Sequence, residues 1–288
     1  MLKLGLPKGS LEEATFALFR RAGWNFRTSG RSYHPVVDDS EISPVLLRPQ
    51  EIPLYVQDGI LDAGITGHDW VQDCGARVAE IGELQYSKNS TNPVRVVLAA
   101  HRDSGFTKVQ DLEDKRIATE YVRLTERWLA EKGVRAKVEF SWGACEVKTP
   151  NLVDAIVVNT ETGSSLRAHN LEIIDELLVS TTRLIANETA WDDEWKRTKI
   201  ESIFLMMQGA IAAEGLVGLK LNVSSERLES VLALMPALRR PTLSPLSDEG
   251  WFAVEVILDE KQARELIPSL RRAGGEGIVE YPLNKVIP

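Results

Sequence analysis

The sequence predicts a mixed α/β protein, and three observations lead to that prediction. Over residues 1–210, short runs of apolar and β-branched residues alternate with segments of helical periodicity, the pattern of α/β folds with mainly parallel sheets. From residue 211 onward the rhythm changes to the order β-α-β-β-α-β, which is the ferredoxin-like order. The length of 288 residues suits two or three domains of ordinary size. We therefore expect an α/β body followed by a ferredoxin-like domain.

The elements of the body follow from apolar runs and from residues that cap helices. Leu2–Leu6 predicts a strand, Ser10 the cap of a helix, and Gly23 the end of that helix. A second helix is predicted over Pro49–Asp58, and another begins at Leu112. The other elements predicted in the body are the strands Val45–Leu47, Ala63–Thr66, Val94–Ala100, Arg116–Thr119, Val138–Phe140 and Asp154–Val158, and a helix over Leu124–Lys132.

A long amphipathic stretch from Trp191 to Glu214 precedes the ferredoxin-like segment, and its apolar side chains are expected to pack between domains. The elements predicted after it are the strand Gly218–Val223, the helix Ser225–Met235, the strands Arg240–Leu246 and Trp251–Leu258, the helix Glu260–Ala273 and the strand Gly277–Tyr281.

Charge and hydropathy exclude two classes of partner and indicate a compartment. The 34 Lys and Arg against 42 Asp and Glu give a formal net charge of −8 without blocks of like charge, which argues against a nucleic-acid or anionic-membrane binder. No window approaches the roughly 18 apolar residues of a membrane span, and the N-terminal residues lack the apolar core of a secretory signal. Cys74 and Cys145 have no CxxC partners. We expect a cytoplasmic protein.

The strongest chemical signal is a strand that leads through a Thr-Gly-Ser-Ser loop into a helix, within residues 154–167. At such a junction free backbone N–H groups, the helix dipole and the hydroxyls of Thr162, Ser164 and Ser165 converge, which suits a phosphate monoester. Gly163 lets the backbone approach the anion closely. The sequence therefore predicts a phosphate-binding loop.

An ordinary structural role for this loop remains open. A strand-to-helix turn with Ser164 as the helix N-cap explains the loop residues equally well. Two acidic residues at the ends of the strand, Asp154 and Glu161, favour the functional role, because carboxylates accept hydrogen bonds from ribose hydroxyls and bind metal-bound pyrophosphate.

Other polar residues follow predicted strands. Lys8 and Gly9 lie between a strand and a helix, where an ammonium and loop amides can face a phosphate chain, and Arg48 suits a bidentate phosphate contact. Each has the alternative of an ordinary surface position. Gly67 ends a strand and admits a close ligand, whereas Asp69 is explained most simply as a helix cap.

Six segments occur together in an order that resembles the ATP phosphoribosyltransferase family. They are LPKGSL at 6–11, LLRPQEIPLYVQDGILDAGITGHD at 46–69, KRIATEY at 115–121, GACEV at 143–147, DAIV with ETGSSLR at 154–167, and TTRLIAN at 181–187. The likeness extends over about residues 1–210. The final unit, with RRPTLSPL at 239–246, resembles the histidine-sensing domain of the long form of this family.

The resemblance implies a two-lobed catalytic unit like a periplasmic binding protein, followed by a regulatory domain. The implied lobes are residues 1–92 with 186–210 and residues 93–185, and the implied regulatory domain is 211–288. The implied reaction joins N1 of ATP to C1 of 5-phosphoribosyl 1-diphosphate (PRPP) and releases pyrophosphate, as the first step of histidine biosynthesis. Mg²⁺ carried on PRPP, feedback inhibition by L-histidine and a homo-oligomer, a hexamer, are implied in the same way.

The resemblance also implies roles for particular residues. Asp154 and Glu161 would hold the PRPP ribose, and the residues expected at its 5-phosphate are Thr162, Gly163, Ser164, Ser165 and Leu166. The residues expected to bind ATP or pyrophosphate are Lys8, Gly9, Arg48, Gly67, Asp69 and Glu146. Thr242 and Ser244 would hold histidine. No metal ligands are predicted.

Two departures from the family pattern affect these roles. Val158 stands where relatives commonly carry an acidic residue, which shifts the weight of ribose binding to Glu161. Val122 and Arg123 replace a frequent Pro-Asn pair, so this part of the cleft is not carried over.

Two alternative functions use the same features. The two-lobed fold also serves non-catalytic small-molecule binding or effector-sensing proteins, but the ETGSSL loop argues against that class. A phosphoribosyltransferase for another base is the second alternative, and both the segment 46–69 and the C-terminal unit argue against it.

Overall fold

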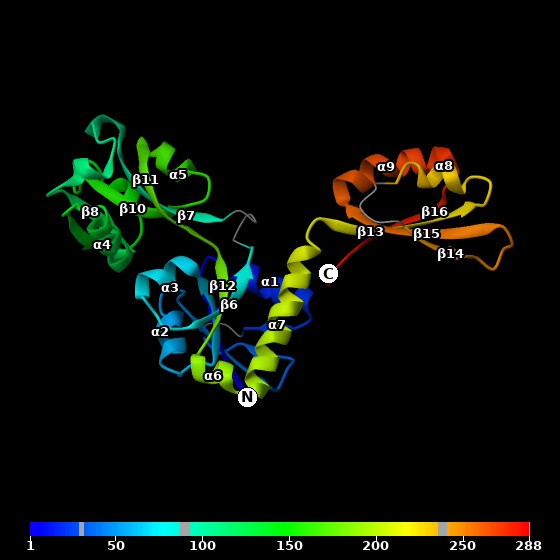
Figure 1. Ribbon diagram of the computed structural model, residues 1–288, viewed down its shortest axis with the longest axis horizontal. Coiled ribbons are helices and arrows are strands. Elements are labelled where there is room, and N and C mark those ends of the chain that lie inside the picture. The colour runs from blue at the N-terminus through cyan, green and yellow to red at the C-terminus, as the bar shows by residue number, and fades with distance from the viewer. Residues whose placement is uncertain (29–31, 87–92, 236–240, 288) are drawn as a thin grey trace. The chain divides into compact units, whose positions relative to one another are not determined.

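The computed structural model describes residues 1–28, 32–86, 93–235 and 241–287 (Figure 1). The chain divides into two compact units, Met1–Met207 and Gln208–Pro288. In the described residues, every helix is too short or too polar to cross a bilayer.

The first lobe of the first unit is built on a five-stranded sheet. Its strands are β1 (Leu2–Pro7), β4 (Ile42–Leu47), β5 (Ala63–Gly67), β6 (Ala79–Leu84) and β12 (Thr182–Ala186), in the order β4-β1-β5-β12-β6. β1 is parallel to β4 and β5, and β12 is antiparallel to β5 and β6. Leu4, Leu46 and Ile65 are fully buried in its core.

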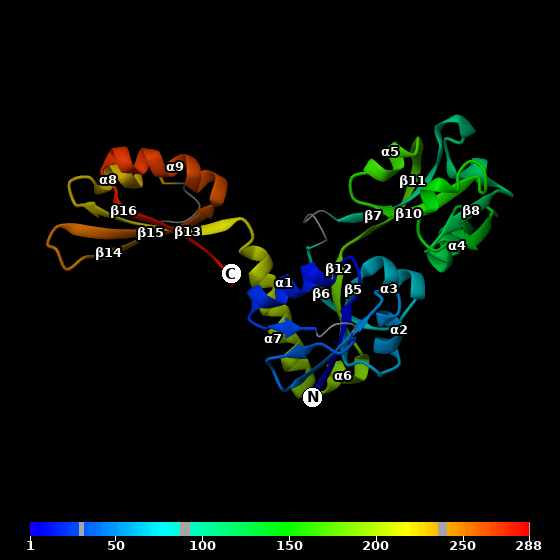
Figure 2. The ribbon, with the colours of Figure 1, turned by 180° about the vertical axis from the view of Figure 1, so that it is seen from behind.

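Helices cover both faces of this sheet. They are α1 (Glu12–Ala22), α2 (Ile52–Gln57), α3 (His68–Cys74), α6 (Glu188–Asp192) and α7 (Glu194–Ala212), and a short ladder joins β2 (Phe26–Arg27) to β3 (Val36–Val37). In two opposite views α2 and α3 lie on one side of the sheet and α1 and α7 on the other (Figures 1 and 2). Leu18, Phe19 and Ala22 bury the apolar side of α1, and Gly23, with φ of 115°, ends it.

The second lobe is a five-stranded mixed sheet. Its strands are β7 (Val94–His101), β8 (Arg116–Thr119), β9 (Lys137–Phe140), β10 (Ala155–Thr160) and β11 (Leu171–Ser180), in the order β11-β7-β10-β8-β9. β8 is parallel to both of its neighbours, β9 and β10, whereas β7 is antiparallel to β10 and β11. The helices of this lobe are α4 (Val122–Glu131) and α5 (Ser164–Ala168), with 3-10 turns at Arg102–Ser104, Val109–Leu112 and Cys145–Val147.

The chain returns from the second lobe to the first at Ser180 and Thr181. β11 ends at Ser180 in the second sheet, and β12 begins at Thr182 in the first. Trp70 of α3 lies in the hydrophobic core of the second lobe together with Tyr121. The two lobes are therefore joined by side-chain packing as well as by the chain.

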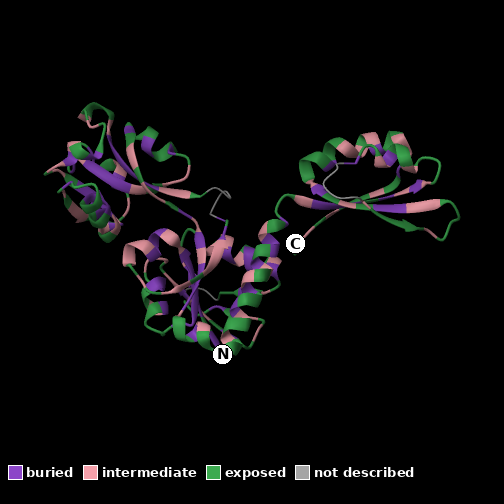
Figure 3. Cartoon of the chain, viewed as in Figure 1, coloured by how far each residue is buried: buried purple, intermediate pink, exposed green. Residues whose placement is uncertain are grey.

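The second unit is a four-stranded antiparallel sheet with two helices on one face (Figure 1). Its elements are β13 (Leu216–Ser224), α8 (Leu228–Leu232), β14 (Thr242–Pro245), β15 (Trp251–Asp259), α9 (Glu260–Ala273) and β16 (Glu276–Pro282). The strand order β14-β15-β13-β16 confirms the ferredoxin-like arrangement. Figure 3 shows the buried stretches of these strands, which include Leu219, Leu221 and Val254.

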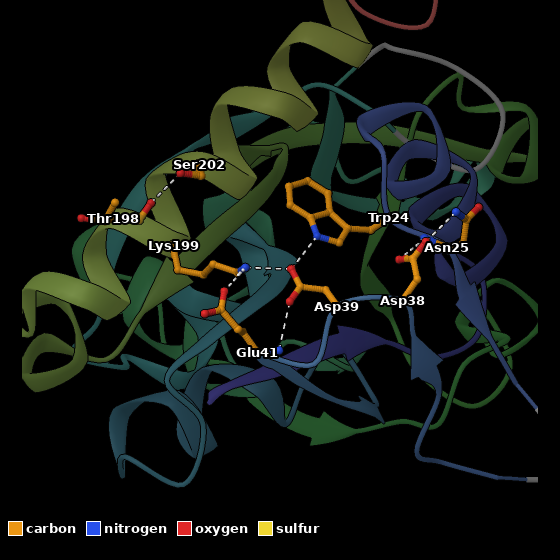
Figure 4. Close-up of polar contacts among 8 residues, drawn as sticks. All are labelled: Trp24, Asn25, Asp38, Asp39, Glu41, Thr198, Lys199 and Ser202. Atoms are coloured by element: carbon orange, nitrogen blue, oxygen red, sulfur yellow. Dashed lines mark hydrogen bonds and ion pairs between the residues drawn. The ribbon is translucent and has the colours of Figure 1, made fainter.

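A cluster of polar contacts holds α7 on the first lobe. Lys199 Nζ donates to Asp39 Oδ2 and to Glu41 Oε2, both at 2.7 Å, and Trp24 Nε1 donates to the same Asp39 oxygen at 3.0 Å (Figure 4). Within α7, Ser202 Oγ donates to the carbonyl of Thr198 at 2.8 Å. The side chains of Lys199 and Asp39 are 17% and 18% exposed, so this pair is largely shielded from water.

Several sequence predictions about elements were wrong. The N-cap of α1 is Leu11 rather than Ser10, and it makes no side-chain cap hydrogen bond. Leu112 ends a 3-10 turn, which Asp111 closes by accepting from two backbone N–H groups, and starts no helix. Both five-stranded sheets of the first unit are mixed rather than mainly parallel.

In the second unit, two elements are shorter than the sequence predicted. The predicted helix Ser225–Met235 is helical only over Leu228–Leu232. The predicted strand Arg240–Leu246 is Thr242–Pro245, and Arg240 lies outside the described residues, as does the start of the segment 239–246.

Candidate functional site

A cavity of about 880 Å³ lies within the first unit, and both lobes line it. The first lobe contributes the loops after β1 and β4 and the start of α3, and the second lobe contributes Glu120, Asn159 and Glu161. Ser180, Thr181 and Thr182, where the chain crosses between the lobes, complete the lining. A cavity of this size is in the range that encloses small ligands.

The parallel strands of the first lobe place basic side chains at the cavity. β1, β4 and β5 are parallel neighbours, so their carboxyl ends meet at one edge of the sheet. Lys8 follows β1, Arg48 follows β4, and Gly67 is the last residue of β5. All three line the cavity, as does Gly9. Two cationic side chains and loop amides therefore share one wall, which suits a phosphate chain.

Tyr33 belongs to this wall, and sequence reasoning missed it. Lys8 Nζ lies 4.3 Å from the centroid of the Tyr33 ring, a cation–π contact, and both residues line the cavity. Tyr33 is in a segment without helical or strand periodicity, so no local pattern drew attention to it.

Carboxylates line the cavity from the second lobe. β8 and β10 are parallel neighbours, and Glu120 and Glu161 follow their carboxyl ends. Glu120 Oε1 accepts a hydrogen bond from the Gly143 backbone N–H at 2.8 Å. The sequence indicated Glu161 but not Glu120, although both are acidic residues that directly follow a buried strand.

The predicted phosphate loop lies beside the cavity, directly after Glu161. Gly163 has φ of 71° and its N–H donates to Thr160 Oγ1 at 2.9 Å. Thr162 Oγ1 accepts from the Ser164 N–H at 3.4 Å, and the Leu166 side chain is buried in the lobe's core. The N-cap of α5 is Gly163, so Ser164 is not the cap that the ordinary explanation required.

Glu146 lies with this loop. Ser165 Oγ donates to Glu146 Oε1 at 2.8 Å, and neither residue lines the cavity. The structure therefore brings Glu146 together with the residues predicted to bind PRPP rather than with Lys8 and Arg48.

Asp154 is separated from Glu161. β10 extends from Ala155 to Thr160, so the two acids flank opposite ends of a strand that spans roughly 20 Å. Asp154 Oδ2 accepts from the Arg116 backbone N–H at 2.9 Å and so holds the start of β8. The pair of acids that the sequence suggested for one ribose does not come together.

Asp69 is buried and makes contacts across the two lobes. Its Oδ2 accepts from the Tyr121 hydroxyl and its Oδ1 from Ser180 Oγ, each at 2.7 Å. The N-cap of α3 is Gly67, so Asp69 is not the helix cap that the sequence favoured. Burial, followed by the charge of Asp69, raises the pKa of Tyr121 well above its ordinary value, which keeps the phenol protonated as a donor.

Thr242 and Ser244 are exposed residues of β14 in the second unit. They lie opposite Glu255 and Ala253 of β15 in the register of the sheet. Thr242 and Ser244 therefore stand on the same face of the sheet, away from the two helices.

The described residues contain no group of three or more His, Cys, Asp or Glu side chains placed to hold a metal ion. The described residues therefore do not fit a metal site in which protein side chains supply all the ligands. A metal ion that brings phosphate oxygens with it needs fewer protein ligands, and Glu120 and Glu161 are two carboxylates that line the cavity.

Comparisons with known proteins agree on one family. The family model described as ATP phosphoribosyltransferase matches residues 48–209, and the model described as HisG, C-terminal domain, matches residues 213–285. An ATP phosphoribosyltransferase of Solibacter usitatus is 58% identical over 287 residues, which cover 100% of this chain and 99% of that protein. That of Pelotomaculum thermopropionicum is 54% identical with the same coverage.

A solved structure of an ATP phosphoribosyl transferase (HisG:HisZ) complex from Thermotoga maritima is also similar. The match has a TM-score of 0.63 and 28% identity, and it covers 72% of this chain and 99% of that chain.

Proposed function

The chain belongs to the ATP phosphoribosyltransferase family, pentosyltransferases that catalyse the first step of histidine biosynthesis, and from this premise we propose where the reaction takes place. ATP and PRPP bind in the cavity of about 880 Å³ between the lobes of the first unit. The observation that carries this proposal is the pairing of a cationic wall, Lys8 and Arg48, with a wall that contains Glu120 and Glu161. One wall suits the phosphate chains, and the other suits the ribose hydroxyls and a metal ion carried on the diphosphate.

The chemistry requires placement rather than a protein nucleophile. N1 of the adenine forms the bond to C1 of the ribose while the bond from C1 to the pyrophosphate oxygen breaks, and the electron pair leaves with pyrophosphate. Lys8 and Arg48 stabilise the charge on the phosphate chains, and Glu161 accepts hydrogen bonds from the ribose hydroxyls. Holding both substrates in line lowers the barrier by pre-paying their loss of orientational freedom.

The loop from Thr162 to Leu166 is the proposed site of the PRPP 5-phosphate. Its support is its position directly after Glu161 and the αL conformation of Gly163, which opens the backbone to an anion. The proposed donors are the backbone N–H of Leu166 and the hydroxyls of Thr162, Ser164 and Ser165, of which Ser165 would turn from Glu146 to the phosphate. Asp154 has no part in this site, because its carboxylate holds β8 at the other end of β10.

Members of this family use a divalent metal ion. We assign Mg²⁺ as that ion, carried on the PRPP diphosphate, with Glu120 and Glu161 as the carboxylates that hold it. When bound, it neutralises charge on the departing pyrophosphate.

The remaining parts of the proposal concern the whole chain. The catalytic lobes are residues 1–92 with 186–210 and residues 93–185, as the resemblance implies, except that the whole of β12 (Thr182–Ala186) belongs to the sheet of the first lobe. Residues 211–288 act as the regulatory domain. L-Histidine binds at Thr242 and Ser244 on the open face of β14 and inhibits the enzyme. The enzyme assembles as a homo-oligomer, a hexamer, in the cytoplasm.

The test is product formation from ATP, PRPP and Mg²⁺, with phosphoribosyl-ATP and pyrophosphate measured separately. Glu161→Gln should lower kcat/KM by about 100-fold, because an amide binds ribose hydroxyls and a metal less strongly than a carboxylate does. Glu172→Gln, a change of the same kind at an exposed position of β11, is the matched control and should keep full activity. Binding of both substrates without any product would contradict the proposal.

A further inference from the structure

Three side chains from distant parts of the sequence form one buried network at the wall of the cavity, which two of them, Asp69 and Ser180, line. Asp69 of α3 accepts from Tyr121, which precedes α4, and from Ser180, the last residue of β11, at 2.7 Å each. Ser180 Oγ accepts in turn from the Asp69 backbone N–H at 2.9 Å. The three residues are 5%, 2% and 2% exposed. They join the first lobe, the second lobe and the crossing between them.

The chemistry of this network makes each hydrogen bond important. Both side-chain donors that Asp69 has among the described residues are neutral hydroxyls, so its buried carboxylate depends on these two hydrogen bonds rather than on an ion pair within the described residues. Loss of one hydroxyl leaves a buried carboxylate oxygen without that partner, which costs more than the hydrogen bond itself contributes. The network is therefore sensitive to removal of a single oxygen atom.

Helices α3 and α4 extend this connection between the lobes. The Trp70 ring stacks on the Tyr121 ring with centroids 4.3 Å apart. Asp73 Oδ1 accepts from the Leu124 N–H at 2.9 Å in the first turn of α4, and Arg127 donates to the Gln72 carbonyl near the end of α3. Each helix thus satisfies free backbone groups at an end of the other.

The network is adjacent in sequence to both walls of the cavity. Glu120 of the second-lobe wall directly precedes Tyr121, and Gly67 of the first-lobe wall lies two residues before Asp69. A Cβ atom at Gly67 would lie 2.1 Å from Asp69 Oδ1, so the β5 end packs tightly against this carboxylate. Asp69 and Ser180 line the cavity, whereas Tyr121 does not.

We propose that Asp69, Tyr121 and Ser180 form an interlobe pin that sets the spacing of the cationic and acidic walls, with Asp69 a positioning residue rather than a ligand of ATP or pyrophosphate. Both carboxylate oxygens of Asp69 accept hydrogen bonds within the pin, whereas the side chains of Lys8 and Arg48 line the cavity and make no hydrogen bond across the lobes to a described residue. The kinetic consequence of the pin rests on the proposed function, and its structural consequence does not.

Tyr121→Phe tests the pin, because it removes one hydroxyl without changing any residue of the cavity wall. We expect kcat/KM to fall about tenfold or more, with KM raised for both substrates, since misplaced walls weaken both. Hydrogen–deuterium exchange should become faster in α3 and α4 and stay unchanged in β13 and β15. Tyr281→Phe, which removes a tyrosine hydroxyl from Glu255 in the second unit, is the matched control and should keep wild-type kinetics.

Asp69→Asn separates the pin from direct ligand binding. An amide can accept from one hydroxyl and donate to the other, so a pin is retained and most activity should survive in Asp69→Asn. Activity lost in Asp69→Asn but kept in Tyr121→Phe would overturn the proposal in favour of a substrate ligand. Unchanged exchange of α3 and α4 in Tyr121→Phe would overturn the proposed pin. This result can be obtained even if the wild-type protein makes no phosphoribosyl-ATP, so failure of the pin and failure of the proposed function are distinguishable. If Tyr121→Phe does not fold, exchange in Ser180→Ala decides in the same way.

Discussion

At the scale of single residues, Gly163 is the position where backbone conformation and proposed binding coincide. Its φ is 71°, and a Cβ atom there would lie 3.0 Å from Arg167 Nη1. We predict that Gly163→Val raises KM for PRPP about tenfold or more, because a β-branched side chain is strained at this φ and shields the loop amides. The strain also lowers the free energy of unfolding by about 1–3 kcal/mol.

Gly133→Val is the matched control for that change. Gly133 has φ of 68° in the same lobe, and a Cβ there meets no atom within 4 Å. It reproduces the backbone strain away from the loop, so PRPP affinity, measured by isothermal titration, should not change. Equal loss of PRPP affinity in both variants would show that the effect of Gly163→Val is general strain.

The sequence predicted several residues of the candidate site that directly follow a strand. Lys8, Arg48 and Glu161 each come directly after a strand, and parallel pairing gathers such positions at one edge of a sheet. Asp154 shares a motif with Glu161 but lies at the other end of β10, because a strand separates residues that sequence spacing places close together. The contacts of Asp69 lie 52 and 111 residues away, beyond the range of any local pattern.

At the scale of elements, strands made of apolar runs were predictable and strands with irregular pairing were not. The predicted strand Arg116–Thr119 has the bounds that the structure shows, and the predicted strand Val94–Ala100 is one residue shorter than the observed strand. β11, Leu171–Ser180, was missed because two register shifts, between Ile173 and Asp175 and between Glu176 and Leu178, interrupt its alternation of apolar and polar residues. Pairing with β7 fixes this strand in spite of its local pattern.

Helix α7 provides a prediction about pH at the same scale. Burial tends to raise the pKa of Asp39, but hydrogen bonds from Lys199 and Trp24 outweigh it, so the pKa lies below its ordinary value of 3.8. The stabilisation is therefore present above that value and is lost as pH falls through the lowered pKa of the folded state. We predict that Lys199→Met lowers the free energy of unfolding by about 1–2 kcal/mol near neutral pH.

Urea titrations at a series of pH values test this prediction. The difference between the wild type and Lys199→Met should shrink once the pH falls below 3.8, as Asp39 becomes protonated and loses its charge. Lys137→Met is the control, because Lys137 pairs with Glu139 at 2.8 Å but is 71% exposed, and little change is expected. A destabilisation of Lys199→Met that persists unchanged into acid would show that packing of the lysine stem, and not the ion pair, holds α7.

At the scale of the whole molecule, the division into two units predicts that catalysis and its regulation can be separated. Each unit has its own hydrophobic cores, and the boundary between Met207 and Gln208 falls inside α7. A chain ended after Ala212 keeps that helix whole. We predict that this shortened chain retains phosphoribosyl-ATP synthesis but is no longer inhibited by L-histidine, because the proposed histidine site on β14 is removed while the cavity stays complete.

A double variant of the full-length chain, Thr242→Val with Ser244→Ala, tests whether the shortened chain loses inhibition because it lacks these two residues. Both residues are exposed on the open face of β14, so the double change should leave the fold and the uninhibited rate unaltered while it weakens histidine inhibition about tenfold or more. The measurement is the histidine concentration that halves the initial rate at fixed ATP and PRPP. Inhibition that survives in the shortened chain would place the histidine site in the first unit, and inhibition lost only on shortening would place it elsewhere in the second.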